Sequence, residues 1–343
     1  MLTTLLSLAL SVPAAAVDAD GKIINGSSAD ADEYPQSGAL LVEAQGNGYF
    51  LCSSTLIAPD VVLTAAHCID PESLQSSGYP VTSDSTFVWT QEPDVSRFGF
   101  GSTDWPVDAA FSAATTFHDS WSIAQLGVGL SLNYDIGLVF LEEPVLDVPF
   151  AYLPTAEEAE QLVEGVEVVI VGWGQQEQNG QTIGVKQQGL SPVGVTSAYE
   201  FHVGPDTDNV RKCHGDSGGP SFQFIETETL DDMRLVGVTS HAYDGTDCSV
   251  TGGVDTRVDY YLDWIDAELR ARCDDGTRAW CEEPGIPLVP VYEEGEDPWA
   301  IPADLVSDVQ MVGCTTASGA GRGAGGAGGL ALLALLGWRR RER

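Results

Sequence analysis

Three segments of the chain carry residue types that together can perform nucleophilic catalysis. His67 lies in the sequence TAAHC (64–68), after an apolar run, and Asp135 opens the sequence DIGLV (135–139). Ser217 lies in the glycine-rich sequence GDSGGP (215–220). A serine hydroxyl is a poor nucleophile at neutral pH unless a neighbouring base, most often histidine, takes its proton. Each residue alone has an ordinary structural interpretation, but all three in this order and context indicate a catalytic site.

These segments together resemble the motifs of the chymotrypsin/trypsin-type serine endopeptidases. The resemblance covers residues 23–271 and includes KIING (22–26), GWG (172–174) and GV (253–254). It implies that Ser217 is the nucleophile, that His67 is the general base and acid, and that Asp135 fixes the imidazole tautomer. It also implies an oxyanion hole formed by the backbone N–H groups of Gly215 and Ser217. Glycine at 215 suits a turn that must present its N–H inward.

The same resemblance implies an all-β fold of two six-stranded antiparallel β-barrels followed by a C-terminal helix. His67 and Asp135 would come from the first barrel and its edge, and Ser217 from the second. Residues 257–270 carry apolar side chains at helical spacing and fit the family's closing helix. The interval between His67 and Asp135 is long for the family, so we expect an enlarged surface loop within residues 71–121.

A short segment ahead of the similar region looks like an activation peptide. Residues 17–22 (VDADGK) are acidic and end in Lys22, directly before Ile23. By resemblance to trypsinogen-like precursors, a trypsin-like protease would cut after Lys22 and free the α-amino group of Ile23. That ammonium would enter the interior and pair with Asp216, and a buried pair of this kind is costly to break. The alternative is that residues 17–22 are only a linker.

The substrate-specificity pocket departs from the trypsin pattern. The resemblance assigns to it Arg211, Ser240, His241, Ala242, Gly253 and Asp255. Arg211 stands six residues before the nucleophile, where trypsins carry Asp, so a preference for Lys or Arg is not supported. If Arg211 faces an open pocket, we expect a preference for acidic residues. If Arg211 pairs with Asp255, we expect a broad or apolar preference, and the cost of an unpaired buried guanidinium favours pairing.

Seven cysteines are consistent with an oxidising compartment. Six lie in the body of the chain, where spacing alone allows 15 pairings. Cys273 and Cys281 are close in sequence and are expected to pair. The resemblance implies the disulfides Cys52–Cys68 and Cys213–Cys248. The chain has neither metal-finger nor EF-hand spacing, and we expect no metal and no cofactor.

Both ends of the chain have the character of targeting segments. Residues 1–16 combine an apolar run with small residues at 14–16, which predicts a secretory signal peptide. Residues 314–343 open with Cys314, continue with an uncharged stretch and end in RRRER, and they resemble the MYXO-CTERM sorting tags of Gram-negative bacteria. The resemblance implies removal of the tag by a processing protease and attachment at the outer cell surface through or near Cys314. A plain tail anchor is the alternative.

Charge and composition limit the partners. The net charge is −36, from 51 acidic and 15 basic residues, so binding to the phosphates of nucleic acid is not expected. The acidic, proline-rich residues 272–313 are expected to form a stalk between enzyme and tag. We expect a monomer that meets protein or peptide substrates, an activating trypsin-like protease and a C-terminal processing protease. Membrane contact would occur only through the tag.

Together these features predict a secreted or surface-anchored serine endopeptidase that is made as a zymogen. The alternative from another functional class is a catalytically inactive binding or adhesion protein with the same fold. Loss of a triad residue would indicate that alternative, and the sequence retains His67, Asp135 and Ser217.

Overall fold

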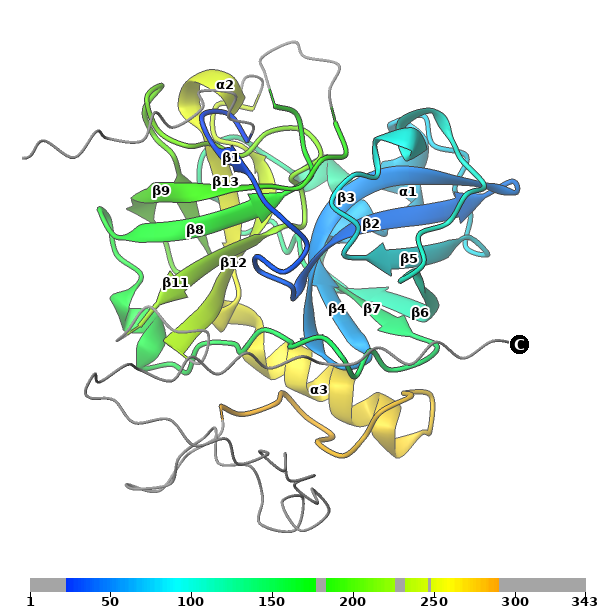
Figure 1. Cartoon of the computed structure of the whole chain (residues 1–343). Helices are drawn as coiled ribbons and strands as arrows, with labels where there is room; N and C mark the ends of the chain where they lie inside the picture. The colour runs from blue at the N-terminus through cyan, green and yellow to red at the C-terminus, as the bar shows by residue number, and fades with distance from the viewer. Residues whose placement is uncertain (1–22, 177–182, 226–231, 246–247, 290–343) are drawn as a thin grey trace, which may run out of the picture. The chain divides into compact units, whose positions relative to one another are not determined.

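The computed structural model describes residues 23–289 with the exception of 177–182, 226–231 and 246–247. Two antiparallel β-barrels lie side by side, the first coloured blue to cyan and the second green to yellow (Figure 1). The prediction of two six-stranded barrels with a C-terminal helix is therefore confirmed.

The first barrel closes in the order β2-β3-β4-β7-β6-β5. Its strands are β2 (Ser37–Ala44), β3 (Asn47–Ala58), β4 (Val61–Thr64), β5 (Thr86–Thr90), β6 (Ala110–Phe117) and β7 (Gly137–Leu141). Valine, leucine and phenylalanine dominate the short strands β4 and β7, which are buried throughout. Such residues suit a strand that packs on both faces. The ends of these two strands carry the first two residues of the candidate site.

The second barrel is formed by β8 to β13, and the short strand β1 (Ser27–Ser28) adds to β9. Its strands are β8 (Glu167–Gly172), β9 (Gln187–Thr196), β10 (Glu200–Val203), β11 (Pro220–Phe224), β12 (Met233–Ala242) and β13 (Gly253–Arg257). Pairing of β8 with both β9 and β11 closes the ring. The turn that leads into β11 carries Ser217.

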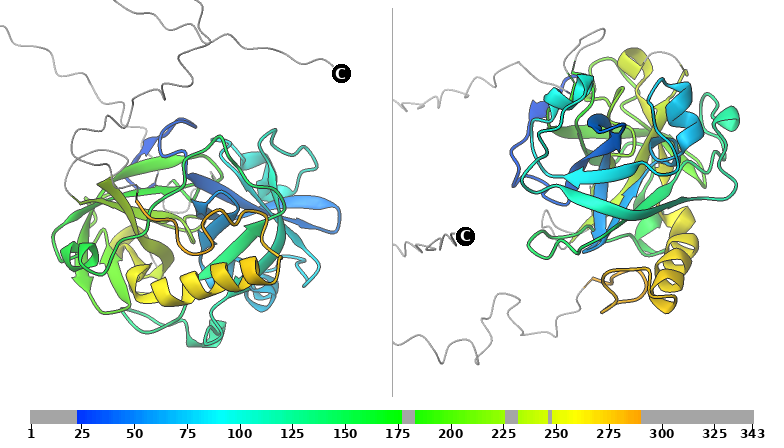
Figure 2. Two further views of the ribbon diagram at one scale, coloured as in Figure 1. Left: turned by 90° about the horizontal axis from the view of Figure 1, so that it is seen from below. Right: turned by 90° about the vertical axis from the view of Figure 1, so that its right-hand side faces the viewer.

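Helices are few in the described residues. They are α1 (Pro71–Ser76), α2 (Cys248–Thr251) and α3 (Leu262–Asp274), with 3₁₀ turns at Ala66–Cys68, Ser96–Phe100, Ile123–Gln125, Glu158–Gln161 and Asp259–Tyr261. Helix α3 lies along one side of the molecule (Figure 2) and buries Ile265 and Leu269. No helix among the described residues is both long enough and apolar enough to cross a membrane.

The folded unit extends beyond residue 271, where composition placed the start of the stalk. Helix α3 continues to Asp274, and the chain stays packed as far as Val289. A fully buried ion pair joins Arg278 Nε to Asp60 Oδ1 at 3.0 Å and fixes this segment to the first barrel. Composition places the start of the stalk too early, because the acids and prolines after residue 271 suggest an extended segment and do not reveal that Arg278 is buried. Residues 290–313 lie outside the described part.

The segment between β5 and β6, residues 91–109, lies within the range 71–121 where an enlarged surface loop is predicted. Arg97 forms a two-pronged ion pair with Glu92 at 2.8 Å, and Phe98 is fully buried. The loop also contacts the second barrel, because Val95 N donates to Gly184 O and Lys186 N donates to Pro93 O, both at 2.7 Å.

Candidate active site

His67 and Asp135 meet at one end of the first barrel. Strands β4 and β7 pair with Thr64 opposite Gly137, so the residues just beyond the end of β4 lie beside those just before β7. The backbone N–H of His67 donates to Asp135 Oδ1 at 3.0 Å, and His67 Nδ1 lies 2.8 Å from Asp135 Oδ2. Two contacts to one carboxylate fix both the position and the ring orientation of the histidine.

The second barrel also holds the Asp135 carboxylate. Ser240 Oγ donates to Oδ2 at 2.6 Å, and Thr256 Oγ1 donates to the Asp135 carbonyl at 3.0 Å. Burial alone would raise the pKa of Asp135, but the charge and hydrogen bond of His67 and the Ser240 hydroxyl hold that pKa below its usual value. Burial lowers the pKa of His67, yet the Asp135 charge and hydrogen bond leave it raised. The pair therefore favours an ionised carboxylate beside a basic imidazole.

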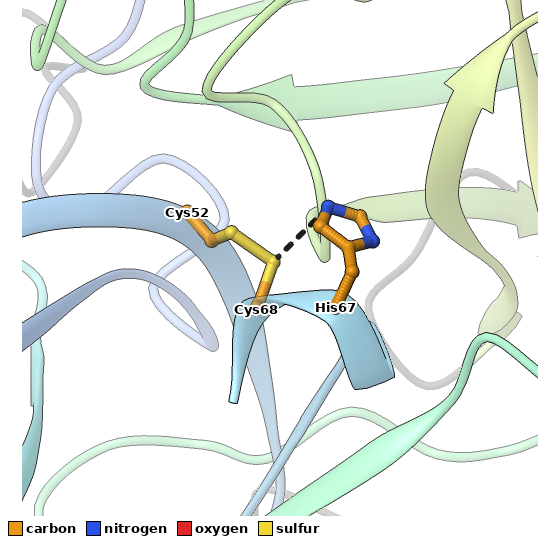
Figure 3. Close-up of side chains that lie close together, drawn as sticks. All are labelled: Cys52, His67 and Cys68. Atoms are coloured by element: carbon orange, nitrogen blue, oxygen red, sulfur yellow. Dashed lines mark hydrogen bonds between the residues drawn. A yellow bond between two sulfur atoms is a disulfide. The ribbon is translucent and has the colours of Figure 1, made fainter. Parts of the chain in front are cut away.

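The remaining ring nitrogen of His67 faces a disulfide. Nε2 lies 3.6 Å from Cys68 Sγ, and Cys68 is bonded to Cys52 (Figure 3). These three residues have the spacing of a metal site, but a disulfide sulfur is not the thiolate that binds metal. The disulfide instead packs against the imidazole at Nε2.

Ser217 lies in a tight glycine turn that packs against the segment before His67. Gly218 has φ +76°, and a Cβ at this position would lie 2.1 Å from Thr64 Oγ1. Only glycine allows the turn to approach the segment before His67 this closely. Ser217 also lines a pocket of about 230 Å³. His67 and Asp135 therefore contact each other, and the turn that carries Ser217 lies against the segment just before His67.

Backbone hydrogen bonds define the turn that carries the predicted oxyanion hole. Gly215 has φ +93°, and the carbonyl of its neighbour His214 accepts from Gln175 N at 2.7 Å. The buried carboxylate of Asp216 accepts from Cys213 N and Gly174 N, both at 2.8 Å. Burial outweighs these bonds and raises the pKa of Asp216 to about 6. A cation that reached Asp216 would therefore be strongly favoured.

The start of the predicted mature chain packs in the second barrel. Ile23 is fully buried, and Ile24 forms an antiparallel bridge with Arg211. Ile23 also has φ +36°, which is unusual for a β-branched residue. Lys22 lies outside the described residues.

Four of the six residues assigned to the specificity pocket line it: Ser240, His241, Ala242 and Gly253. The disulfide Cys213–Cys248 forms part of the same wall. This disulfide, Cys52–Cys68 and Cys273–Cys281 are the three pairings expected from the sequence.

The predicted pair between Arg211 and Asp255 is wrong. Lys212 is the partner of Asp255, with Nζ 2.7 Å from Oδ2 and both side chains almost fully buried. Lys212 Nζ also donates to Ser221 Oγ at 2.9 Å. Arg211 is absent from the pocket lining of the described residues, and its side chain packs against Gly204. Adjacent residues of an extended segment point in opposite directions, so Arg211 and Lys212 cannot both face Asp255.

Sequence reasoning also missed Glu200, an acid buried in strand β10. Its side-chain oxygens accept from Ser131 N at 2.7 Å and from Asn133 Nδ2 at 2.8 Å, just before Asp135 in the chain. Burial raises the pKa of Glu200 to about 7. The only sequence signal was an acid within the strand sequence EFHV.

Glu200→Gln is expected to change how stability depends on pH. The pKa of Glu200 is about 7 in the folded protein, against an ordinary value of 4.5. Between these two pH values the folded state binds more protons than the unfolded state, so the free energy of unfolding falls as pH rises. Glutamine does not titrate, so the free energy of unfolding of the variant lacks this decrease with pH. Relative to wild type, the variant should gain on the order of 3 kcal/mol between pH 4.5 and 8, measured by urea unfolding of a Ser217→Ala background.

Glu158→Gln is the matched control. Burial would raise the pKa of Glu158, but its hydrogen bond from Arg234 and those from Thr155 hold it below the usual value. Glu158 is therefore ionised in both states above about pH 5, and its variant should differ from wild type by a constant amount. A constant difference for Glu200→Gln as well would contradict the prediction.

Comparisons with known proteins agree with this geometry. The sequence model of the family described as Trypsin matches residues 23–265. Phenoloxidase-activating factor 3 of Holotrichia diomphalia is 30% identical over 277 residues, which cover 73% of each chain. Chymotrypsin-like elastase family member 1 of Canis lupus familiaris is 26% identical over 264 residues, which cover 72% of this chain and 92% of the relative. A trypsin of Saccharopolyspora erythraea is 28% identical over 273 residues, which cover 73% and 99%.

The matched family region contains both barrels, the His67–Asp135 pair and the Ser217 turn. The chain therefore belongs to the trypsin family and is a serine endopeptidase.

Proposed function

We propose that this serine endopeptidase works through a triad of Ser217, His67 and Asp135 and is made as a secreted zymogen. The observation that carries the proposal is the His67–Asp135 contact of 2.8 Å beside the glycine turn of Ser217. Asp135 holds the imidazole of His67 in place, and a histidine base is what a serine nucleophile needs.

The chemistry follows from this arrangement. His67 takes the proton of Ser217 Oγ as the oxygen attacks the scissile carbonyl, and Asp135 stabilises the imidazolium that forms. The N–H groups of Gly215 and Ser217 bind the oxyanion of the tetrahedral intermediate. His67 then donates its proton to the leaving amine, which leaves an acyl group on Ser217. A water molecule then attacks the acyl carbonyl with the help of His67, which releases the carboxylic acid product and restores Ser217.

Activation would follow cleavage after Lys22. The new α-ammonium of Ile23 would pair with the buried Asp216, whose pKa burial raises to about 6 and which a nearby cation would stabilise in its ionised form. The positive φ of Ile23 supports this proposal, because strain of this kind is on the order of 1–3 kcal/mol and chain cleavage would relieve it.

The test is hydrolysis of a protein substrate. Full-length protein is treated with a small amount of trypsin, and the trypsin is then inhibited. The treated protein should show a new N-terminus at Ile23 and should degrade casein. Ser217→Ala treated in the same way should be cut at the same bond and remain inactive. Equal activity of the two proteins would place the chemistry elsewhere. Inactivity of both would favour a non-catalytic binding protein.

The pocket favours uncharged substrate side chains at the residue before the scissile bond. Asp255 neutralises Lys212 at the pocket floor, so among the described residues that line the pocket neither a cation nor an anion finds a free counter-charge. The walls contributed by Ala242 and the Cys213–Cys248 disulfide are apolar. The broad or apolar preference expected for a paired floor is retained, with Lys212 in the place that sequence reasoning gave to Arg211.

Lys212→Ser is expected to create a preference for lysine. Removal of the ammonium leaves the Asp255 carboxylate buried and uncompensated, which costs about 3–5 kcal/mol. A substrate lysine could return an ammonium to that position. We expect kcat/KM for a Lys substrate, relative to a Leu substrate, to rise by at least about 10-fold. Lys212→Ser/Asp255→Asn should lose the gain, and an unchanged ratio in the single variant would contradict the proposed floor.

The predicted ends of the chain complete the proposal but lie outside the described residues. A signal peptide at 1–16 would export the protein, and residues 290–313 would carry the enzyme away from a surface tag at 314–343. Intact mass of surface-released protein tests the tag. Retention of residues 330–343 in the mature form would contradict sorting through Cys314.

A further inference from the structure

Ser53, on strand β3, contacts the catalytic turn although it belongs to the other barrel. Its side chain is fully buried. Its hydroxyl donates to the carbonyl of Gly215 at 3.0 Å and accepts from the N–H of Trp173 at 2.9 Å. Its backbone N–H donates to the carbonyl of Ser217 at 2.8 Å. One residue of the first barrel therefore holds two carbonyls of the turn that carries the nucleophile.

The bond to Gly215 matters because of what that residue does in the proposed mechanism. Gly215 has φ +93°, in a region that glycine enters freely, so the residue itself resists rotation very little. The orientation of its N–H depends on how the two adjoining peptide planes are held. On one side the His214 carbonyl accepts from Gln175 N, and on the other the Gly215 carbonyl accepts from Ser53.

Trp173 makes the link tighter. Its N–H uses the same hydroxyl oxygen as acceptor, and its neighbour Gly174 donates to the Asp216 carboxylate. A serine hydroxyl has one donor and two acceptor sites, so the donor is committed to Gly215. Loss of the hydroxyl would leave the buried Trp173 N–H without this acceptor. It would also remove one hydrogen bond from the buried Gly215 carbonyl.

We propose that Ser53 is a positioning residue for the oxyanion hole. It acts through the Gly215 carbonyl and keeps the Gly215 N–H directed at the developing oxyanion. The inference rests on the proposed function of the Ser217 triad. Preorganised donors stabilise the transition state more than the bound substrate, so the effect of Ser53 falls on kcat.

Ser54 provides a matched control on the same strand. It is also fully buried, and its hydroxyl donates to a backbone carbonyl, that of Gly38, at 3.0 Å. That bond lies within the first barrel, because Gly38 belongs to β2. A purely structural role would give Ser53→Ala and Ser54→Ala similar consequences.

The experiment compares Ser53→Ala and Ser54→Ala in full-length protein cleaved after Lys22. Both should unfold at lower urea concentration than wild type. With a peptide amide that has an uncharged residue before the scissile bond, Ser53→Ala should lower kcat by about 10-fold and leave KM unchanged. A peptide boronate, which forms a tetrahedral adduct with the serine, should bind this variant more weakly by about the same factor. Ser54→Ala should change neither quantity.

Equal kcat losses in the two variants, or a loss expressed only in KM, would overturn the proposal. If Ser53→Ala does not fold, Ser53→Cys replaces it, since a thiol has similar size but is a weaker donor. That variant should show a smaller loss, again in kcat and in boronate binding. Failure of wild type to react with a fluorophosphonate would instead count against the triad itself. If wild type reacts with the fluorophosphonate and Ser53→Ala keeps wild-type kcat and boronate binding, the result contradicts the role of Ser53 and leaves the triad intact.

Discussion

Asp135→Asn is expected to lower kcat of the activated enzyme by about 10⁴-fold, the size known for this exchange in a Ser-His-Asp triad. The carboxylate accepts two hydrogen bonds from His67, one from the backbone and one from Nδ1. An asparagine amide that donates to Nδ1 would place the histidine proton on Nε2. The imidazole could then not take the proton of Ser217.

This prediction is checked by steady-state hydrolysis of a peptide amide, with urea unfolding as the test of folding. Ser240→Ala is the graded control, because it leaves the carboxylate and removes the third of its hydrogen bonds, together with a contact to His241 Nδ1. A hydrogen bond to a charged group contributes about 1.5–3 kcal/mol, so kcat should fall by roughly 10- to 100-fold. Losses of similar size in both variants would mean that Asp135 acts only by holding the barrels together.

Lys22→Gln is expected to leave the protein as an inactive precursor when trypsin is added. Without the Ile23 ammonium, Asp216 has among the described residues the two backbone hydrogen bonds from Cys213 and Gly174, and we expect the oxyanion turn to be less firmly held. Removal of one oxyanion donor typically costs about 10²–10³ in kcat, and we expect the uncleaved chain to be at least that much slower. Mass spectrometry of the N-terminus and peptide hydrolysis measure the two parts of this prediction.

Asp216→Asn separates cleavage from activation. It should be cut after Lys22 as wild type is, yet its peptide hydrolysis should stay slow, because the new ammonium finds no carboxylate. A fully active Asp216→Asn variant after cleavage would contradict the switch.

The neutral pocket floor also implies that the enzyme does not cut after its own Lys22, so untreated wild type should remain a precursor.

The predictions for the candidate site rest on short local motifs. His67, Asp135 and Ser217 each lie in a segment whose neighbours determine a strand end or a glycine turn. The two barrels followed from the family resemblance that these motifs carry, since alternating apolar residues alone do not define the closure of a barrel. Cys273–Cys281 followed from closeness in sequence.

The parts that the sequence did not reveal depend on contacts between distant segments. Whether residue 211 or 212 faces Asp255 depends on which side of an extended segment points inward, and motif position does not state this. Glu200 is defined by its contact with the loop before Asp135, in the other barrel. Ser53 is followed by two more hydroxyl residues, and only its contacts with Gly215 and Trp173 distinguish it.

The most direct test of the account is the reaction of cleaved wild-type protein with a fluorophosphonate probe, followed by peptide mapping of the adduct. We expect one labelled residue, Ser217, with labelling that is slow in the uncleaved precursor and absent after Asp135→Asn over the same time. Labelling elsewhere, or none in protein shown to begin at Ile23, would contradict it.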